Sequence, residues 1–368
     1  MRHRDIRGSS GTGQHGDGKS SGAAATETLP HRSSRRRLLG AIGACVISVA
    51  AASPARAEPA YTLRLASWGA PTAPQVVDFT STFKDEVEKT SGGRIAVQTF
   101  PAGSLVNERA VPTAIQSGVV DISLTTMGSW SSIVPTAGAL NTVFFRPTAA
   151  NFDKVIGPGT SLFKALDDDM AKHGVRLLAA LYNGPVVVVS KAPMKSPDDF
   201  KGKTVRVFDR LTAEIVQALR GSPSTIEVAD VYPALQRGTV QAAIGGLEGA
   251  IGLKEYEVGK YLLATNGEFG LLLTGYVMNR KSLEALPADL QKVVLDAAYD
   301  ASRHATQAMI AAYEKELDQM QQHGMTVTAL KPEMPEYKQF DDALAQLAKT
   351  QEQRFPEPLI RAVLDAQR

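Results

Sequence analysis

The sequence predicts an α/β fold of two lobes with mostly parallel sheets and a long connecting helix, and three observations support this. Strand and helix patterns alternate in two separate regions, 61–124 and 205–244. One amphipathic pattern, 287–323, is long enough to extend along both lobes. Subtracting a predicted export signal of 57 residues from the 368-residue chain leaves 311, enough for two lobes with separate cores.

The first region alternates strand, helix, strand, helix and strand, an order that favours a parallel sheet. Tyr61–Ala66 alternates apolar with polar residues, as a half-buried strand does. One helix is expected around 76–87, where apolar residues repeat at helical spacing, and another at 108–117, where Gly118 provides a stop. Strands are expected at 61–66, 94–100, 119–124, 174–179 and 186–190.

The second region indicates a strand, two helices and a returning strand. Val205–Val207 forms the first strand, and Thr212 is placed to N-cap a helix that Gly221 ends. The second helix covers 229–238 and leads into a strand at 239–244. This order implies a second α/β lobe with a largely parallel sheet.

Arg206 is the strongest binding candidate in this region. Ligands on parallel sheets bind at the carboxyl ends of the strands, and Arg206 lies close to such an end. A guanidinium there can hold a carboxylate by two parallel hydrogen bonds, which a lysine cannot do. By the pattern alone, an ordinary surface or ion-paired arginine is the commoner outcome.

Residues 287–323 form the longest regular pattern in the chain. Pro287 suits a first helical turn and Gly324 suits a stop, with a mostly apolar stripe between them. At 1.5 Å per residue this helix would reach roughly 55 Å, enough to lie along both lobes. The stripe is rich in alanine and lacks sustained heptads, which argues against a coiled coil or a membrane-surface helix.

The amino terminus predicts export from the cytoplasm. Arg35 and Arg36 precede an apolar run, 38–52, which ends in an A-x-A site with cleavage expected between Ala57 and Glu58. The paired arginines favour a twin-arginine export signal within residues 1–57, and the general secretory route is the alternative.

We expect replacement of both Arg35 and Arg36 by lysine to block the appearance of mature protein outside the cytoplasm, because the twin-arginine route reads that pair. Cell fractionation measures this, and mass spectrometry of the wild type should find a mature terminus at Glu58. Unimpaired export of the double variant would indicate the general secretory route, and a lipidated Cys45 would overturn the cleavage position.

Composition argues against several classes of protein. Residues 1–57 hold nine of the 40 Lys/Arg and three of the 38 Asp/Glu, which leaves 31 basic against 35 acidic residues. This mature balance of −4 gives no sign of binding to nucleic acid or to a membrane surface.

Side chains for catalysis or metal binding are scarce. Cys45 is the single cysteine and lies inside the apolar run, so lipid anchoring there is a minor alternative and the mature chain has no cysteine. The mature histidines, 173, 304 and 323, lack metal-ligand spacing, and the chain shows no nucleophile elbow, P-loop or dinucleotide fingerprint. We therefore predict neither an enzyme nor a cofactor or metal site.

The run from Met194 to Leu263, centred on Lys201-Gly-Lys-Thr-Val-Arg206-Val, resembles the solute-binding proteins of tripartite ATP-independent periplasmic (TRAP) transporters, of the dicarboxylate-binding type. The G-x-x-D-I step at Gly118 to Ile122 matches the same family. The resemblance implies a periplasmic-binding-protein-like fold with a hinge. Lobe I would comprise 58–183 plus 271–310, and lobe II 184–270 plus 311–368.

In that family the arginine of the K-x-R-V strand forms a salt bridge with the ligand's carboxylate, a role that the resemblance gives to Arg206. The protein would then be a periplasmic monomer that captures an organic acid and delivers it to TRAP membrane permease subunits. Trp68 and Trp130 follow predicted strands and would line the cleft, with buried packing as the equal alternative. The predicted ligand-binding residues are Arg206, Trp68, Thr126, Trp130, Asn183, Phe208, Tyr232 and Gly245.

Two positions depart from the family pattern. Many relatives carry a second arginine in Y-N-G-x-R, where this chain has Val186 after Tyr182-Asn-Gly-Pro. Many also carry a ligand-binding asparagine in D-G-x-E-N, and the run Gln241–Gly245 has glycine at that position. The loss of one charge and one amide favours a smaller or more apolar monocarboxylate, because unpaired polar ligand groups cost affinity. A ligand-sensing partner of a membrane receptor, and less so a secreted enzyme, are the alternative functions.

Overall fold

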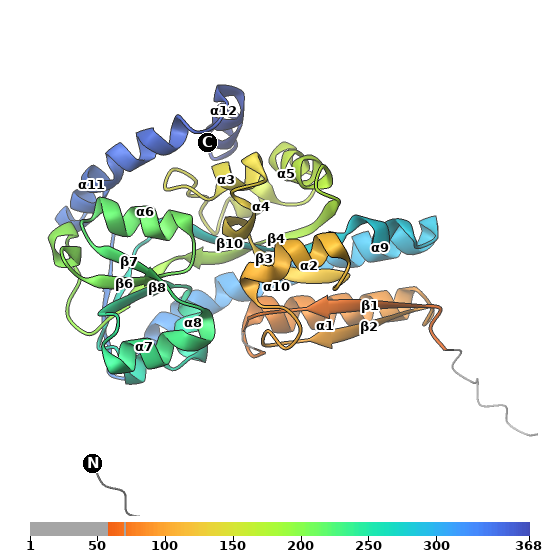
Figure 1. Cartoon of the computed structure of the whole chain (residues 1–368), viewed down its shortest axis with the longest axis horizontal. Helices are drawn as coiled ribbons and strands as arrows, with labels where there is room; N and C mark the ends of the chain where they lie inside the picture. Colours follow the sequence, from red (N-terminus) through yellow and green to blue (C-terminus); the bar gives the residue numbers. More distant parts are fainter. Residues whose placement is uncertain (1–57, 70) are drawn as a thin grey trace, which may run out of the picture. The chain divides into compact units, whose positions relative to one another are not determined.

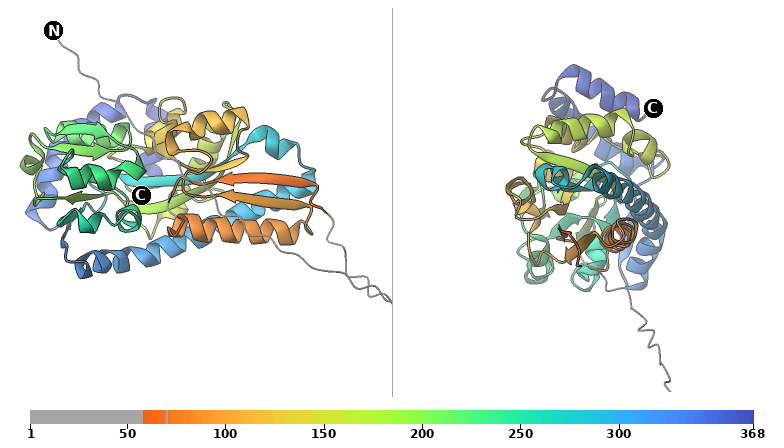
Figure 2. Two further views of the ribbon diagram at one scale, coloured as in Figure 1. Left: turned by 60° about the horizontal axis from the view of Figure 1, so that its bottom comes forward. Right: turned by 90° about the vertical axis from the view of Figure 1, so that its right-hand side faces the viewer.

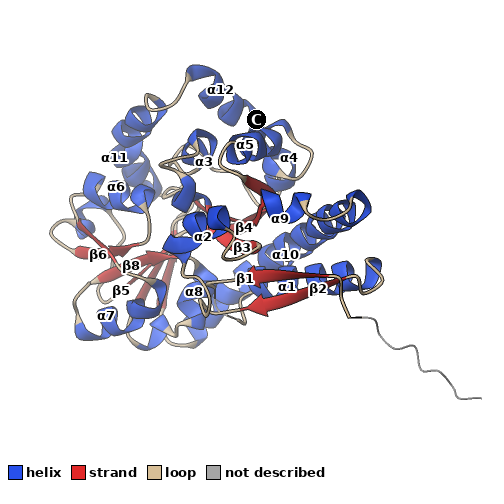
Figure 3. Ribbon diagram, turned by 45° about the vertical axis from the view of Figure 1, so that its right-hand side comes forward, coloured by secondary structure: helices blue, strands red, loops and turns tan. Residues whose placement is uncertain are grey.

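The computed structural model describes residues 58–69 and 71–368. The predicted export signal, with Arg35, Arg36 and Cys45, lies outside these described residues. The described chain belongs to one compact unit, within which the strands form two separate sheets (Figures 1 and 3). Each sheet has helices packed on its faces, so the predicted two-lobed α/β architecture is confirmed.

The first sheet has the strand order β2-β1-β3-β10-β4. Its strands are β1 (Tyr61–Ala66), β2 (Ile95–Phe100), β3 (Ile122–Thr126), β4 (Val175–Pro185) and β10 (Leu271–Asn279). As predicted, β1, β2 and β3 are parallel, but β10 runs antiparallel to both β3 and β4. The cause is that β10 enters from the second sheet and so runs against its neighbours.

The second sheet has the order β11-β9-β5-β8-β6-β7. Its strands are β5 (Val187–Ser190), β6 (Thr204–Val207), β7 (Ser222–Thr225), β8 (Ala242–Gly245), β9 (Tyr261–Ala264) and β11 (Thr326–Ala329). Here β6 is parallel to β7 and β8, whereas β5 is antiparallel to β8 and β9. In each sheet of the described residues a single strand, β10 or β5, therefore runs against the others, so both sheets are mixed but mostly parallel, as predicted.

Each sheet buries side chains on both faces. In β5, for example, Val187 and Val189 face one core while Val188 faces the other, as strand pleating requires. The helices covering the first sheet are α1 (Pro74–Thr90), α2 (Val111–Ser117), α3 (Pro135–Leu140), α4 (Phe152–Ile156), α5 (Ser161–Ala171) and α9 (Arg280–Glu284). Those covering the second are α6 (Arg210–Ala218), α7 (Val231–Arg237), α8 (Leu247–Gly252) and α11 (Pro335–Glu352).

Up to residue 322, three segments connect the lobes. The strand β4 continues almost directly into β5, and residues 265–270 lead from β9 back to β10. The third is α10 (Ala288–Gln322), whose 35 residues correspond to about 52 Å (Figure 2). Its first half, including Leu290 and Val294, packs on the first sheet, while Leu317 and Met320 pack on the second.

The helix limits differ slightly from prediction. Pro287 is the N-cap residue of α10 rather than part of its first turn, and Gly324 follows the end at a φ of +85°. At α6, Asp209 is the N-cap and Thr212 is the N3 partner of a capping box, so the predicted cap at Thr212 is corrected. The aspartate takes this role because its carboxylate accepts from the Thr212 backbone N–H at 2.9 Å.

The carboxyl-terminal helix departs from the predicted lobe division. In α12 (Glu357–Ala366), Ile360 and Val363 join the core of the first sheet, together with side chains of α3, α4 and α5. By contrast, Phe340 and Leu344 of the preceding α11 pack in the second lobe. The segment 311–368 therefore contributes to both lobes, because an apolar face at its end covers the first.

Candidate functional site

A cavity lies between the two lobes at the carboxyl end of β6, with a volume of about 60 Å³. The first lobe contributes Trp68, from the loop after β1, and Thr126, from the end of β3. The second lobe contributes Arg206 and Phe208 from β6 and the residue that follows it, and Gly245 from the end of β8. These five of the predicted ligand-binding residues thus come together around one small cavity.

Arg206 is held rigidly by the second lobe. It is 5% exposed, and its guanidinium donates from Nε to the carbonyl of Ile226 at 3.0 Å and from Nη1 to that of Ile244 at 2.8 Å. Gly245 adjoins this guanidinium, and a Cβ there would make an ordinary contact of 3.6 Å with Nη1. The guanidinium also lies over the Phe208 ring, 5.6 Å from its centroid.

These contacts leave one edge of the guanidinium for another partner. Among the described residues no hydrogen bond uses Nη2, and no carboxylate lies within 4.0 Å of Arg206. Burial lowers the pKa of Arg206, while the nearby Glu255 and Glu108 charges raise it. An arginine stays protonated in proteins, so a buried cation faces the cavity without an ion-pair partner.

Three carboxyl groups line the same cavity, and the sequence interpretation missed all of them. Glu108 begins the 3₁₀ turn η1 (Glu108–Ala110), Glu248 lies in α8, and Glu255 begins the 3₁₀ turn η5 (Glu255–Glu257). Of the three, only Glu248 has a position in the sequence that could have indicated a binding role: it follows the carboxyl end of β8, where ligands bind on such sheets. They meet at Arg206 because η1 of the first lobe packs against the segment of α8 and η5 in the second lobe.

The hydrogen bonding of the three carboxyl groups differs. Glu108 accepts from the Thr126 hydroxyl at 2.7 Å, and Glu248 accepts from the amides of Gln75 at 3.2 Å and Asn183 at 3.3 Å. Glu255, only 6% exposed, has no side-chain hydrogen bond or ion pair within the described chain. Burial raises the pKa of both Glu108 and Glu255 to about 7.

These raised pKa values predict a stability change with pH. The pKa of Glu108 and Glu255 rises from 4.5 to about 7 on folding, so the folded state binds the protons more tightly. Their contribution is complete below about pH 4.5 and is lost as the pH rises through 7. We expect the protein in this closed state to be less stable at pH 8 than at pH 5.5, by about 2 kcal/mol for each group.

Thermal unfolding at the two pH values measures this change. Carboxyl groups with a lowered pKa, such as Asp121 and Glu214, titrate below pH 5.5 and do not contribute to the stability change between pH 5.5 and pH 8. Glu255→Gln should flatten the dependence, whereas Glu257→Gln, an exposed residue of the same turn, should not. Equal stability of the wild type at both values would contradict the prediction.

Polar contacts across the cleft show that the lobes are closed on each other. Asn141 of the first lobe donates to Asp209 of the second at 2.8 Å, and the Arg109 guanidinium lies 3.0 Å from Glu227. Gly128 fits so closely that a Cβ there would lie 2.5 Å from Asp209 Oδ2. Asp209 is the second residue after the strand that carries Arg206, so closure and the site are linked.

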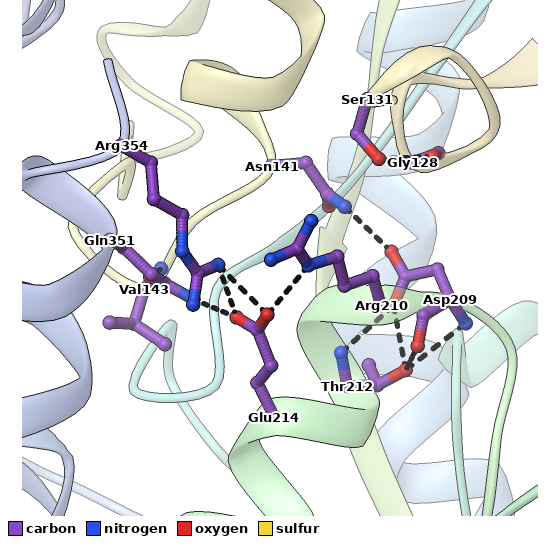
Figure 4. Close-up of polar contacts among 10 residues, drawn as sticks. All are labelled: Gly128, Ser131, Asn141, Val143, Asp209, Arg210, Thr212, Glu214, Gln351 and Arg354. Carbon is purple, nitrogen blue, oxygen red and sulfur yellow. Dashed lines mark hydrogen bonds and ion pairs between the residues drawn. The ribbon is translucent and has the colours of Figure 1, made fainter. Parts of the chain in front are cut away.

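A second polar network joins α6 to the end of α11, as Figure 4 shows. Glu214 accepts from Arg210 Nε at 2.7 Å, from Arg354 Nη1 at 2.7 Å and from Gln351 at 3.1 Å. Burial opposes ionisation, but these hydrogen bonds lower the pKa of Glu214. The side chain of Gln351 also accepts from the Val143 backbone N–H at 3.0 Å, which connects the network to the first lobe.

Three predicted ligand-binding residues lie elsewhere. Trp130 is fully buried in the first-lobe core, where its indole N–H donates to Thr125 at 2.9 Å, so packing is its role. Asn183 lies behind the cavity wall and positions Glu248. Tyr232 points to the surface, where its hydroxyl donates to Glu257 at 2.9 Å. Local sequence could not distinguish these positions because each depends on how distant segments pack.

Other kinds of site are not found in the part of the chain that the structure describes. No group of three or more His, Cys, Asp or Glu side chains there is arranged to hold a metal ion. No helix of residues 58–69 and 71–368 combines the length and the apolar character needed to cross a membrane.

Two known proteins similar to this chain are periplasmic binding proteins. The C4-dicarboxylate-binding periplasmic protein of Rhodobacter capsulatus is 26% identical over 294 residues, covering 79% of this chain and 86% of that protein. The 2,3-diketo-L-gulonate-binding periplasmic protein of Escherichia coli is 26% identical over 266 residues, covering 71% and 78%. The match to an uncharacterized protein of Sinorhizobium fredii, 28% identical over 277 residues, spans only 49% of that relative.

Solved structures share the fold. A sugar-acid-binding protein from Advenella mimigardefordensis, in complex with galactonate, has a TM-score of 0.77 at 22% identity over 84% of this chain and 98% of that chain. A Bordetella pertussis extracytoplasmic solute receptor that binds pyroglutamic acid has a TM-score of 0.76 at 19% identity, covering 83% and 99%. The family model described as bacterial extracellular solute-binding protein, family 7, matches residues 66–354, more than half of the chain. With this match and the closed two-lobed fold, the chain belongs to the family 7 bacterial extracellular solute-binding proteins.

Proposed function

We propose that this protein captures an organic acid by its carboxylate and delivers it to the membrane permease subunits of a TRAP transporter. The observation that supports this most directly is the buried Arg206 guanidinium, which lacks an ion-pair partner and borders a cavity between the lobes. Family membership supports the transport role, and four of the proteins named above bind organic acids. The ligand-binding residues at the cavity would be Arg206, Trp68, Thr126, Phe208 and Gly245.

The carboxylate would approach the open edge of the guanidinium. Because Nε donates to Ile226 and one Nη1 hydrogen to Ile244, the pair Nη1–Nη2 remains for two parallel hydrogen bonds. Val186, where many relatives carry a second arginine, is 2% exposed and packs in the second-lobe core. Arg206 would therefore be the main cationic partner of the ligand.

A thermal-shift screen of carboxylic acids tests this function, because a ligand that binds only the folded state raises the unfolding temperature. Mass spectrometry of each stabilising compound after incubation should return it unchanged, since we propose a binding protein and not an enzyme. A converted compound would indicate catalysis. Failure of every carboxylic acid to stabilise the protein would overturn the proposed function.

The two lobes should open when no ligand is bound. The β4–β5 junction and residues 265–270 cross between the sheets and would act as the hinge, as in periplasmic binding proteins. We expect small-angle X-ray scattering to give a smaller radius of gyration with saturating ligand than without it. An unchanged radius would indicate a rigid pocket that does not close.

In the cell, we propose that the mature protein works in the periplasm as a monomer after removal of residues 1–57. Its partners would be the small acid and the permease subunits, with no role for nucleic acid. Co-purification of the mature protein with those subunits in the presence of ligand tests the delivery step.

A further inference from the structure

The cavity around Arg206 contains more acidic than basic side chains. Arg206 is the one basic residue among the described residues that line it, against Glu108, Glu248 and Glu255. A simple carboxylate ligand would neutralise the guanidinium and leave the carboxyl groups facing each other and the ligand. Ionised carboxylates in a closed cleft are strongly disfavoured without a positive partner. The lining therefore suits a ligand that brings positive as well as negative charge.

Glu255 is the group that points to this most directly. Its side chain is 6% exposed and borders the cavity, yet it has no hydrogen bond or ion pair within the described residues. Buried polar side chains in native proteins nearly always have a partner. The charge of Arg206 acts on Glu255, but the polar atoms of the two side chains are more than 4.0 Å apart. A ligand lying between the two could pair with both.

The other two carboxyl groups are fixed by their neighbours. Thr126 holds Glu108, while Gln75 and Asn183 hold Glu248 from the first lobe. Gly246 permits this arrangement, since a Cβ there would lie 2.5 Å from Glu248 Oε2. These groups therefore form a preorganised acidic wall beside Glu255, which adds to the attraction for a cation.

We propose that the cavity binds a small zwitterion, a carboxylic acid that also carries a protonated or quaternary nitrogen. Its carboxylate pairs with Arg206 and its cationic nitrogen faces Glu255, beside Glu108 and Glu248. This inference rests on the proposed function, because it takes Arg206 as the carboxylate partner. The competing arrangement is a hydroxy or keto acid that accepts hydrogen bonds from protonated glutamates.

Matched ligand pairs distinguish these two arrangements. Each pair shares its carboxylate and carbon skeleton and differs in the nitrogen: alanine with lactate, 2-aminobutyrate with 2-hydroxybutyrate, and proline with pyroglutamate, whose ring nitrogen is a neutral amide. Titration calorimetry should show that the cationic member of at least one pair binds about tenfold tighter or more. Glu255→Gln keeps the size of the side chain but removes its charge. It should reduce the ratio of the two affinities, cationic member over its matched partner, to about one.

Glu257→Gln is the matched control, because Glu257 belongs to the same turn as Glu255 but is exposed and bonded to Tyr232. It should leave the ratio unchanged. A ratio that also survives in Glu255→Gln would overturn the assignment to Glu255.

A pH series gives a second measurement. The charged groups around Glu255 are Arg206 on β6, Glu248 on α8 and Glu108 in η1. Burial raises the pKa of Glu255 to about 7, so it must release a proton before it can pair with a cation. Affinity for the cationic ligand should rise about tenfold between pH 6 and pH 8, and affinity for the matched hydroxy acid should fall.

The outcomes separate this inference from the proposed function. Tighter binding of the hydroxy acids or of pyroglutamate, abolished by Arg206→Ala, would overturn the zwitterion and leave carboxylate capture intact. A different result would overturn both the zwitterion and carboxylate capture: neither member of any pair binds, and the wild type and Arg206→Ala give the same result for every carboxylate tried.

Discussion

Arg206→Ala should weaken ligand binding by roughly thirty-fold to several thousand-fold. Arg206 is buried in the closed cleft, so its pairing with a carboxylate is poorly screened by water. Truncating one partner of a buried charge pair costs on the order of 2–5 kcal/mol, and about 1.4 kcal/mol corresponds to a factor of ten. Titration calorimetry with a ligand from the thermal-shift screen measures the loss.

Two further variants make this result specific. Arg206→Lys should recover only part of the affinity, because an ammonium cannot reproduce two parallel hydrogen bonds. Arg220→Ala removes an exposed arginine of the same lobe and should bind like the wild type. Circular dichroism must show that each variant is folded, since Arg206→Ala also leaves the Ile226 and Ile244 carbonyls unpaired. Wild-type affinity in Arg206→Ala would contradict the proposal that Arg206 binds the ligand's carboxylate.

Gly128→Val should weaken binding by about ten-fold to a hundred-fold without destabilising the ligand-free protein. A Cβ at this position would lie 2.5 Å from Asp209 Oδ2 and 3.1 Å from Asp209 Cβ, across the cleft. Overpacking of this kind costs about 1–3 kcal/mol. The cost falls mainly on the closed state, because opening separates Gly128 from Asp209. The contact that remains, at 3.1 Å, is with the side-chain amide of Asn141 in the first lobe. Apparent affinity drops in proportion to the closed population.

A graded series tests this steric explanation. Gly128→Ala should have a smaller effect than Gly128→Val, and Asn141→Ala, which removes a cleft hydrogen bond without adding bulk, a smaller one still. Calorimetry gives the affinities, and thermal unfolding without ligand should show little change. Equal affinity across the series would mean that the Gly128–Asp209 contact is absent from the bound state.

Elements with a strong local pattern were predictable from sequence. The apolar face of α1, the 35-residue α10 and the strand that carries Arg206 each follow from periodicity and from nearby glycines and prolines. Such patterns depend on residues within one or two turns of each other. Their details were less certain: Asp209 rather than Thr212 caps α6, because both can accept from a backbone N–H and geometry decides between them.

The local sequence pattern does not predict whether a strand is parallel or antiparallel to its neighbours. An isolated apolar run such as 271–279 has the same alternation whether its neighbours are parallel or antiparallel. Only the return of the chain from the second lobe makes β10 antiparallel to β3 and β4. For the same reason, α12 covers the first lobe although the chain reaches it from the second.

By itself, the sequence determined the α/β class, the two lobes and the arginine at a strand end. Only the tertiary structure placed Trp68 at the cavity and Trp130 in the core, two tryptophans that follow strands in the same way. It alone brought Glu108, Glu248 and Glu255 around Arg206. The physical reason is that secondary structure depends on neighbours in the chain, whereas burial and charge in a binding site depend on segments that are far apart in the chain.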